Sequence, residues 1–84
     1  WRWHPSQRFD LDQLSQWLAR WPWRRAKLVV HGRSGWQSAN ALDGQVLVFG
    51  SSEWRRDSRI ELIFSEPQSQ AELQQGMTAC RIDD

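Results

Sequence analysis

The chain has 84 residues, 39% of them hydrophobic, and a formal net charge of +1 from 11 basic and 10 acidic side chains. This length fits one small domain with a modest core, and the near-balanced charge argues against non-specific nucleic-acid binding. No apolar run approaches the roughly 18 residues of a membrane span. The single Cys excludes an internal disulfide, and this usage is typical of a reducing compartment, so we expect a cytoplasmic protein.

The first predicted elements are a short strand and an amphipathic helix. Alternating aromatic residues at Trp1 and Trp3 predict an edge strand that ends at Pro5. Asp10 is typical of a helix N-cap and is followed three residues later by Gln13, a capping-box pattern. Apolar residues then recur at three-to-four spacing and predict a helix over 10–20, which Pro22 ends. These apolar residues are Leu11, Leu14, Trp17, Leu18 and Trp21, and we expect Trp17 to lie in the core.

The middle of the chain predicts a β-hairpin. Residues 24–31 alternate, with Ala26, Leu28 and Val30 on one face and Lys27, Val29 and His31 on the other. The turn sequence Gly-Arg-Ser-Gly over residues 32–35 separates this strand from a second one that starts at Trp36. Both strands therefore belong to one antiparallel sheet.

Further turns and one more strand follow. Asp43-Gly44 predicts a turn before the apolar run 46–49, and residues 50–52 predict a loop. Residues 59–64 predict a strand whose apolar side chains, those of Ile60, Leu62 and Phe64, share one face.

A second helix follows the break at Pro67. Ser69 and Glu72 form another capping-box pattern, and the side chains of Leu73, Met77 and Cys80 share one helical face. Gly76 weakens this helix by roughly 1 kcal/mol relative to Ala.

The order of the elements predicts the fold class. Strands grouped between two helices are typical of an α+β domain. We expect a small antiparallel sheet of about four strands, with two helices packed on one face, in the order β-α-β-β-β-α. Residues 1–84 form a single domain in this prediction.

A dense polar cluster at residues 54–59 is the first candidate site. It comprises Trp54, Arg55, Arg56, Asp57, Ser58 and Arg59. One interpretation is a loop anchor, because Asp and Ser commonly organise turns through their own backbone. The other is a docking surface that pairs Arg with carboxylates of a partner. No nucleophile or metalloprotease motif accompanies the cluster, so the chain alone is not expected to be an enzyme.

Metal binding and self-association are two further hypotheses. His31 and Cys80 are weak candidate ligands, but zinc sites need three or four converging ligands, usually with closely spaced pairs. We therefore expect no stable metal site within the domain, although an accessory ligand to a shared site stays open. Trp and Arg are enriched in protein interfaces, so the Trp-rich composition also suits a homo-oligomer.

Several short motifs carry a resemblance to a known family. They are Arg8-Phe9-Asp10 with Leu14, Arg25-Ala26-Lys27, Gly35-Trp36 with Asn40, residues 54–61, and Leu73 with Cys80. In this order and spacing the chain resembles the C-terminal domain of the CobW-like P-loop GTPases, the metallochaperone and cobalamin-synthesis proteins. Leu28 departs from the pattern, because many members have Gly after the Arg-Ala-Lys triplet.

The resemblance implies that the chain is a fragment of a longer GTPase. The P-loop that would hold GTP and Mg²⁺ is absent from these residues, as is the Cys-rich motif for a transition metal such as Zn or Co. It also implies a non-catalytic accessory domain without its own cofactor. Its expected partners are the N-terminal GTPase domain of the same chain and a metal-receiving client protein, with no nucleic acid or membrane.

Overall fold

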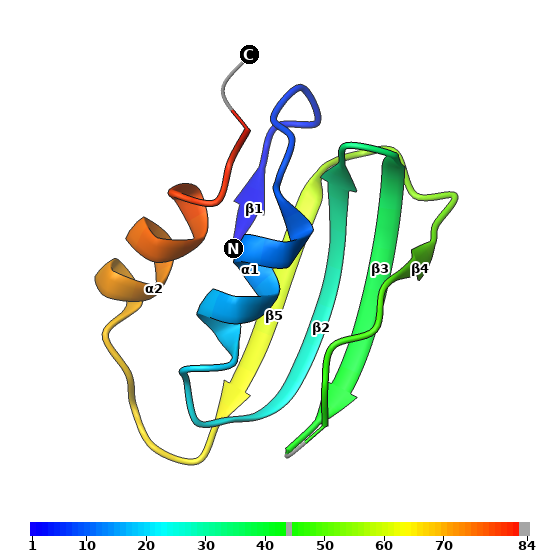
Figure 1. Ribbon diagram of the computed structural model, residues 1–84. Coiled ribbons are helices and arrows are strands. Elements are labelled where there is room, and N and C mark those ends of the chain that lie inside the picture. The colour runs from blue at the N-terminus through cyan, green and yellow to red at the C-terminus, as the bar shows by residue number, and fades with distance from the viewer. Residues whose placement is uncertain (44, 83–84) are drawn as a thin grey trace.

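Two helices pack on one face of a five-stranded antiparallel sheet in the computed structural model, which describes residues 1–43 and 45–82 (Figure 1). The predicted α+β class is confirmed, with five strands in these residues instead of about four. The elements are β1 (Arg2–Trp3), α1 (Leu11–Leu18), β2 (Trp23–Gly32), β3 (Gly35–Leu42), β4 (Gly50–Ser51), β5 (Ser58–Phe64) and α2 (Gln70–Thr78). Across the sheet the strands lie in the order β1-β5-β2-β3-β4.

Both helices begin at the predicted caps. The Asp10 side chain accepts a hydrogen bond from the backbone N–H of Gln13 at 3.1 Å, and Ser69 accepts one from Glu72 at 3.3 Å. Helix α1 ends at Leu18, earlier than predicted, and the backbone N–H groups of Arg20 and Trp21 then close two tighter turns by donating to the carbonyls three residues before them. This follows from Pro22, because a residue that precedes proline is disfavoured in the helical conformation.

The β2–β3 hairpin is the centre of the sheet. Its strands pair from Arg25↔Leu42 to Gly32↔Gly35, which leaves a two-residue turn inside the predicted four-residue sequence. Gly35 has a φ of 111°, a backbone conformation that favours glycine. Strand β2 also pairs with β5, so it has a partner on both sides.

The core lies between the helices and the sheet face that they cover. The predicted inward residues Ala26, Leu28 and Val30 are buried there. Trp23 is also buried, and its indole N–H donates to the Leu18 carbonyl at 2.8 Å. Trp17, which was expected in the core, is only partly buried because it lies at the edge of the helix layer against α2.

The additional strand β4 lies at Gly50–Ser51, where the sequence predicted a loop. It pairs with β3 through Gln37↔Ser51 and Ser38↔Gly50. Upstream of it, Leu47 and Phe49 pack against the core while Val46 and Val48 are exposed. Gly44, part of the predicted turn, lies outside the described residues.

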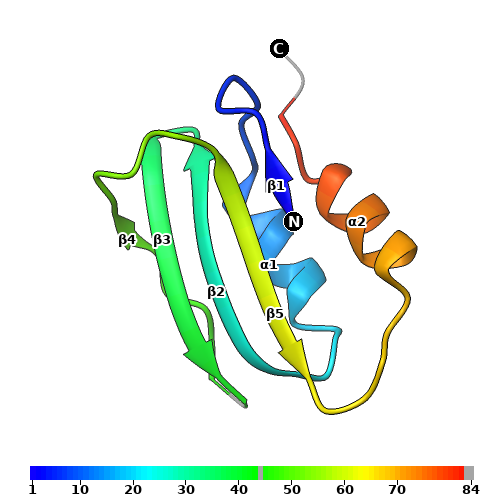
Figure 2. The same ribbon diagram turned by 180° about the vertical axis from the view of Figure 1, so that it is seen from behind.

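Seen from behind, the sheet has an uncovered face (Figure 2). Both helices lie on its far side, so the side chains of alternate strand residues face outward without a second layer. Within the part of the chain that the structure describes, no helix is long and apolar enough to cross a membrane.

Candidate functional site

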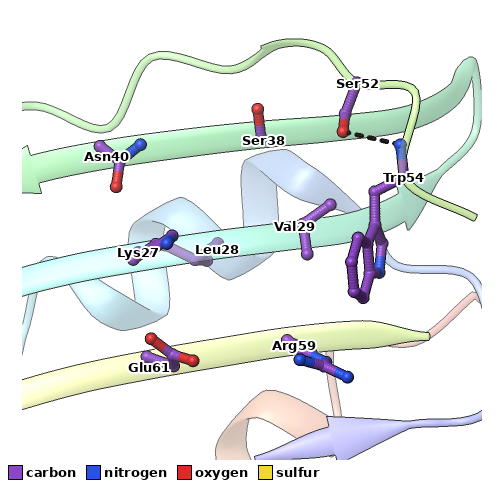
Figure 3. Close-up of a pocket in the computed structure, with 9 residues that line it drawn as sticks. All are labelled: Lys27, Leu28, Val29, Ser38, Asn40, Ser52, Trp54, Arg59 and Glu61. Atoms are coloured by element: carbon purple, nitrogen blue, oxygen red, sulfur yellow. Dashed lines mark hydrogen bonds between the residues drawn. The ribbon is translucent and has the colours of Figure 1, made fainter. Parts of the chain in front are cut away.

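A hollow of about 300 Å³ on the uncovered sheet face is the candidate site (Figure 3). Strand register brings its floor together, because Lys27 lies between Asn40 and Glu61, and Val29 lies between Ser38 and Arg59. The polar and basic side chains therefore come from three neighbouring strands. The residues that line the hollow are Lys27, Leu28, Val29, Ser38, Asn40, Ser52, Trp54, Arg59 and Glu61.

Trp54 forms the wall at one end of this hollow. The chain leaves β4 at one edge and passes the end of the β2–β3 hairpin to reach β5, and the crossing loop, residues 52–57, makes that connection (Figure 1). From this loop the Trp54 side chain extends beside Val29 toward Arg59 (Figure 3). Its backbone N–H donates to the Ser52 hydroxyl at 3.2 Å, and its indole N–H donates to the Asp57 carbonyl at 2.8 Å. These bonds fix the ring.

Asp57 and Arg59 form an ion pair next to the ring. The Arg59 Nε lies 2.8 Å from a carboxylate oxygen of Asp57, and both side chains are less than one-third exposed. Hydrogen bonding to Arg59 is the main reason why the pKa of Asp57 lies below its ordinary value. The guanidinium carbon of Arg59 lies 4.7 Å from the Trp54 ring centroid, and that of Arg56 lies 5.6 Å from it. Both distances are typical of cation–π contacts.

The remaining residues of the predicted cluster have different surroundings. Arg55 donates to the backbone carbonyls of Ser52 and Trp54 within the loop. Ser58 is fully buried, and its hydroxyl accepts a hydrogen bond from the backbone N–H of His31 at 3.1 Å. The cluster therefore has the internal contacts of a loop anchor, and it also presents Trp54 and Arg59 to the hollow, while Arg56 lies over the Trp54 ring.

The two candidate metal ligands make separate contacts. His31 Nδ1 donates to the Pro5 carbonyl at 2.8 Å, since a carbonyl oxygen can only accept, and its ring stacks on Trp36 at 4.7 Å. Cys80 is buried two residues beyond the end of α2, not on the helix as predicted, and its thiol donates to the Gly76 carbonyl. Burial is the main reason why the pKa of Cys80 is raised, which favours a thiol over a thiolate ligand.

No group of three or more His, Cys, Asp or Glu side chains suited to a metal ion occurs within residues 1–43 and 45–82. Within these residues, neither His31 nor Cys80 belongs to a cluster of the three or four ligands that a zinc site needs.

Sequence reasoning did not single out the floor of the hollow. Lys27 and Val29 were placed on the outer face of their strand, and Asn40 and Glu61 appeared only among the motifs of the family resemblance, whereas Ser38 carried no signal of its own. The signal that could have found them is alternation itself, because outward positions on paired strands meet once the register is known.

No family model, curated protein or solved structure matches this chain.

Proposed function

We propose that this chain is a non-catalytic accessory domain of a CobW-like, GTP-dependent metallochaperone. Its role is to make protein contacts while a metal cofactor is delivered or cobalamin is synthesised in the cytoplasm. The observation that carries the proposal is the uncovered sheet face with a hollow walled by Trp54. The motif order over the length of the chain supports the family assignment.

The partners in this proposal are the N-terminal GTPase domain and a metal-receiving client protein. GTP, Mg²⁺ and a transition metal, Zn or Co, are bound by the GTPase domain, because the present residues include no P-loop. The accessory domain recognises the client protein. Its binding to that protein depends on the nucleotide state of the neighbouring GTPase domain.

The geometry of the hollow suits protein recognition. Trp and Arg are the residue types that most often dominate interface energetics, and here Trp54 is held beside Arg59 by bonds from both its backbone and its ring. A wall that is already ordered loses little conformational entropy when a partner binds. The crossing loop thus acts as an anchor that also presents a contact surface.

Two experiments test this proposal. The coding sequence upstream of Trp1 should encode a P-loop with Gly-Lys-Ser or Gly-Lys-Thr. The GTPase domain encoded there should then bind the 84-residue chain, and Asn40→Tyr should weaken that binding by at least about tenfold because a large, uncharged side chain fills the hollow.

The matched control is Gln16→Tyr, which introduces the same side chain on the exposed surface of α1. Both variants should keep the circular dichroism spectrum of the native chain. An equal loss of affinity in the two variants, or none in Asn40→Tyr, would place the contact surface elsewhere.

Self-association is the alternative function, and a specific feature favours it. Four large apolar side chains are at least half exposed, those of Leu42, Val46, Val48 and Ile63. Leu42 and Ile63 lie on either side of Arg25 in the sheet register. A second copy of the chain could cover them.

A further inference from the structure

We infer that the uncovered sheet face binds an acidic protein surface. This inference rests on the proposed function and adds the chemistry of the partner. The strand positions on this face carry four basic side chains, those of Arg2, Arg25, Lys27 and Arg59, against a single carboxylate, Glu61. Because the whole chain has a formal charge of only +1, its positive charge is concentrated on this face.

Within the described residues, Arg59 is the one of these four cations that forms a close ion pair, with Asp57. Asp57 also attracts Arg2, but the described residues provide no ion pair for Arg2, Arg25 or Lys27, all of which are exposed. Arg56, which lies over the Trp54 ring, is a further exposed cation of the crossing loop. The face can therefore accept carboxylates at Arg25 and Lys27 without first breaking internal ion pairs.

The register also places like charges together. Arg2 lies directly opposite Arg59 in the β1–β5 pair, and the Asp57 carboxylate, which pairs with Arg59 and also attracts Arg2, offsets part of their repulsion. Two cations share this one carboxylate, so a partner carboxylate beside them would lower the repulsion that remains. Arginine forms well-oriented, often bidentate hydrogen bonds with carboxylates, so the arrangement favours a partner rich in Asp and Glu.

Nucleic acid fits the same face less well. Bases bind sheet surfaces by stacking on free aromatic rings, but Arg56 and Arg59 lie over the Trp54 ring. Trp36 is stacked on His31. The structure therefore favours an acidic protein over RNA.

The test is a nuclear magnetic resonance titration of the 84-residue chain with a polyglutamate peptide and, separately, with polyuridine RNA, at about 20 mM salt, where charge screening is weak. Polyglutamate should shift the backbone amide signals of residues 25–29 and 59–61. Raising the salt to about 300 mM should weaken the binding strongly.

Lys27→Glu should raise the dissociation constant for polyglutamate by at least about tenfold. Arg20→Glu, the matched control, changes the charge equally at an exposed position before β2 and should raise it by less than about threefold. Because Lys27→Glu sets two carboxylates opposite each other, Lys27→Gln is the second variant, and it should weaken binding in the same direction.

Three results would overturn the inference. The first is the absence of amide shifts with millimolar polyglutamate. The second is an equal loss of affinity for polyglutamate in Lys27→Glu and Arg20→Glu. The third is tighter binding of polyuridine that depends on the same residues, which would identify a nucleic-acid surface. Should the GTPase domain bind as proposed while polyglutamate does not, the accessory function stands and only the acidic chemistry fails.

Discussion

A single glycine controls how the two helices meet. Gly76 lies inside α2, where it costs roughly 1 kcal/mol relative to Ala by intrinsic propensity. A Cβ atom at this position would lie 2.0 Å from Cζ2 of Trp17 on α1. The glycine therefore allows the indole ring of one helix to pack directly on the backbone of the other.

Gly76→Ala should destabilise the protein even though alanine favours helices. Overpacking of this kind typically costs about 1–3 kcal/mol, which exceeds the gain in propensity, and urea unfolding would measure the difference. Gln74→Ala, at an exposed position of the same helix, should change stability by less than about 0.5 kcal/mol.

A double-mutant cycle tests the cause. In a Trp17→Leu background the ring is gone, so Gly76→Ala should become neutral or stabilising. If Gly76→Ala lowers the free energy of unfolding equally in both backgrounds, the contact with Trp17 does not explain why glycine occupies this position.

At the scale of elements, the crossing loop determines where β5 begins. The loop joins strands that are not neighbours in the sheet, so few backbone ladder bonds are available to it. Side-chain bonds replace them, from Trp54 to the Asp57 carbonyl and from Arg59 to the Asp57 carboxylate. The ionised form of Asp57 is thus part of how the loop is held.

Asp57→Asn should reduce the amount by which the free energy of unfolding falls in acid. The pKa of Asp57 is lowered in the folded state from its ordinary value of 3.8, so its contribution is present above that value and is lost as the pH falls through the lower, folded-state pKa. Urea unfolding of both proteins from neutral pH to about pH 3 would show the native protein losing more stability than the variant.

Glu53→Gln is the control, since it neutralises an exposed carboxylate of the same loop for which the described residues provide no ion pair. Parallel stability curves for the native protein and Asp57→Asn would contradict the assigned role of the ion pair with Arg59.

At the scale of the whole molecule, the basic sheet face and an exposed apolar segment are two different surfaces. Trp54, Arg25 and Lys27 lie on the uncovered sheet face, where the exposed Leu42 and Ile63 flank Arg25, while Val46 and Val48 are exposed on the segment that leads into β4. The first surface suits a charged partner, and the second is of the kind that promotes association between copies.

We expect the 84-residue chain to be monomeric, because the four exposed apolar side chains, those of Leu42, Val46, Val48 and Ile63, bury too little area for a stable dimer, which needs about 1,200 Å² or more. Analytical ultracentrifugation over a hundredfold range of concentration would measure this. A dimer that Val46→Lys with Val48→Lys abolishes, and that Lys27→Gln does not, would establish the alternative function of self-association.

The sequence predicted the elements whose signals are local. Asp10 and Ser69 marked both helix starts, and alternation in β2 identified the buried side as Ala26, Leu28 and Val30. These features depend on neighbours within a few residues, so side-chain periodicity and capping chemistry are sufficient to find them. The polar cluster at 54–59 was found for the same reason, since its members are adjacent in the chain.

Features that depend on distant pairing emerged only in the tertiary structure. Strand β4 exists because Gly50 and Ser51 lie beside β3, although neither residue favours a strand. The hollow exists because Lys27, Asn40 and Glu61 become neighbours through strand register, and the partner of Gly76 is a ring 59 positions earlier in the chain. Composition and periodicity thus determined the class of fold and its core, whereas long-range strand order decided which face is uncovered and what it can bind.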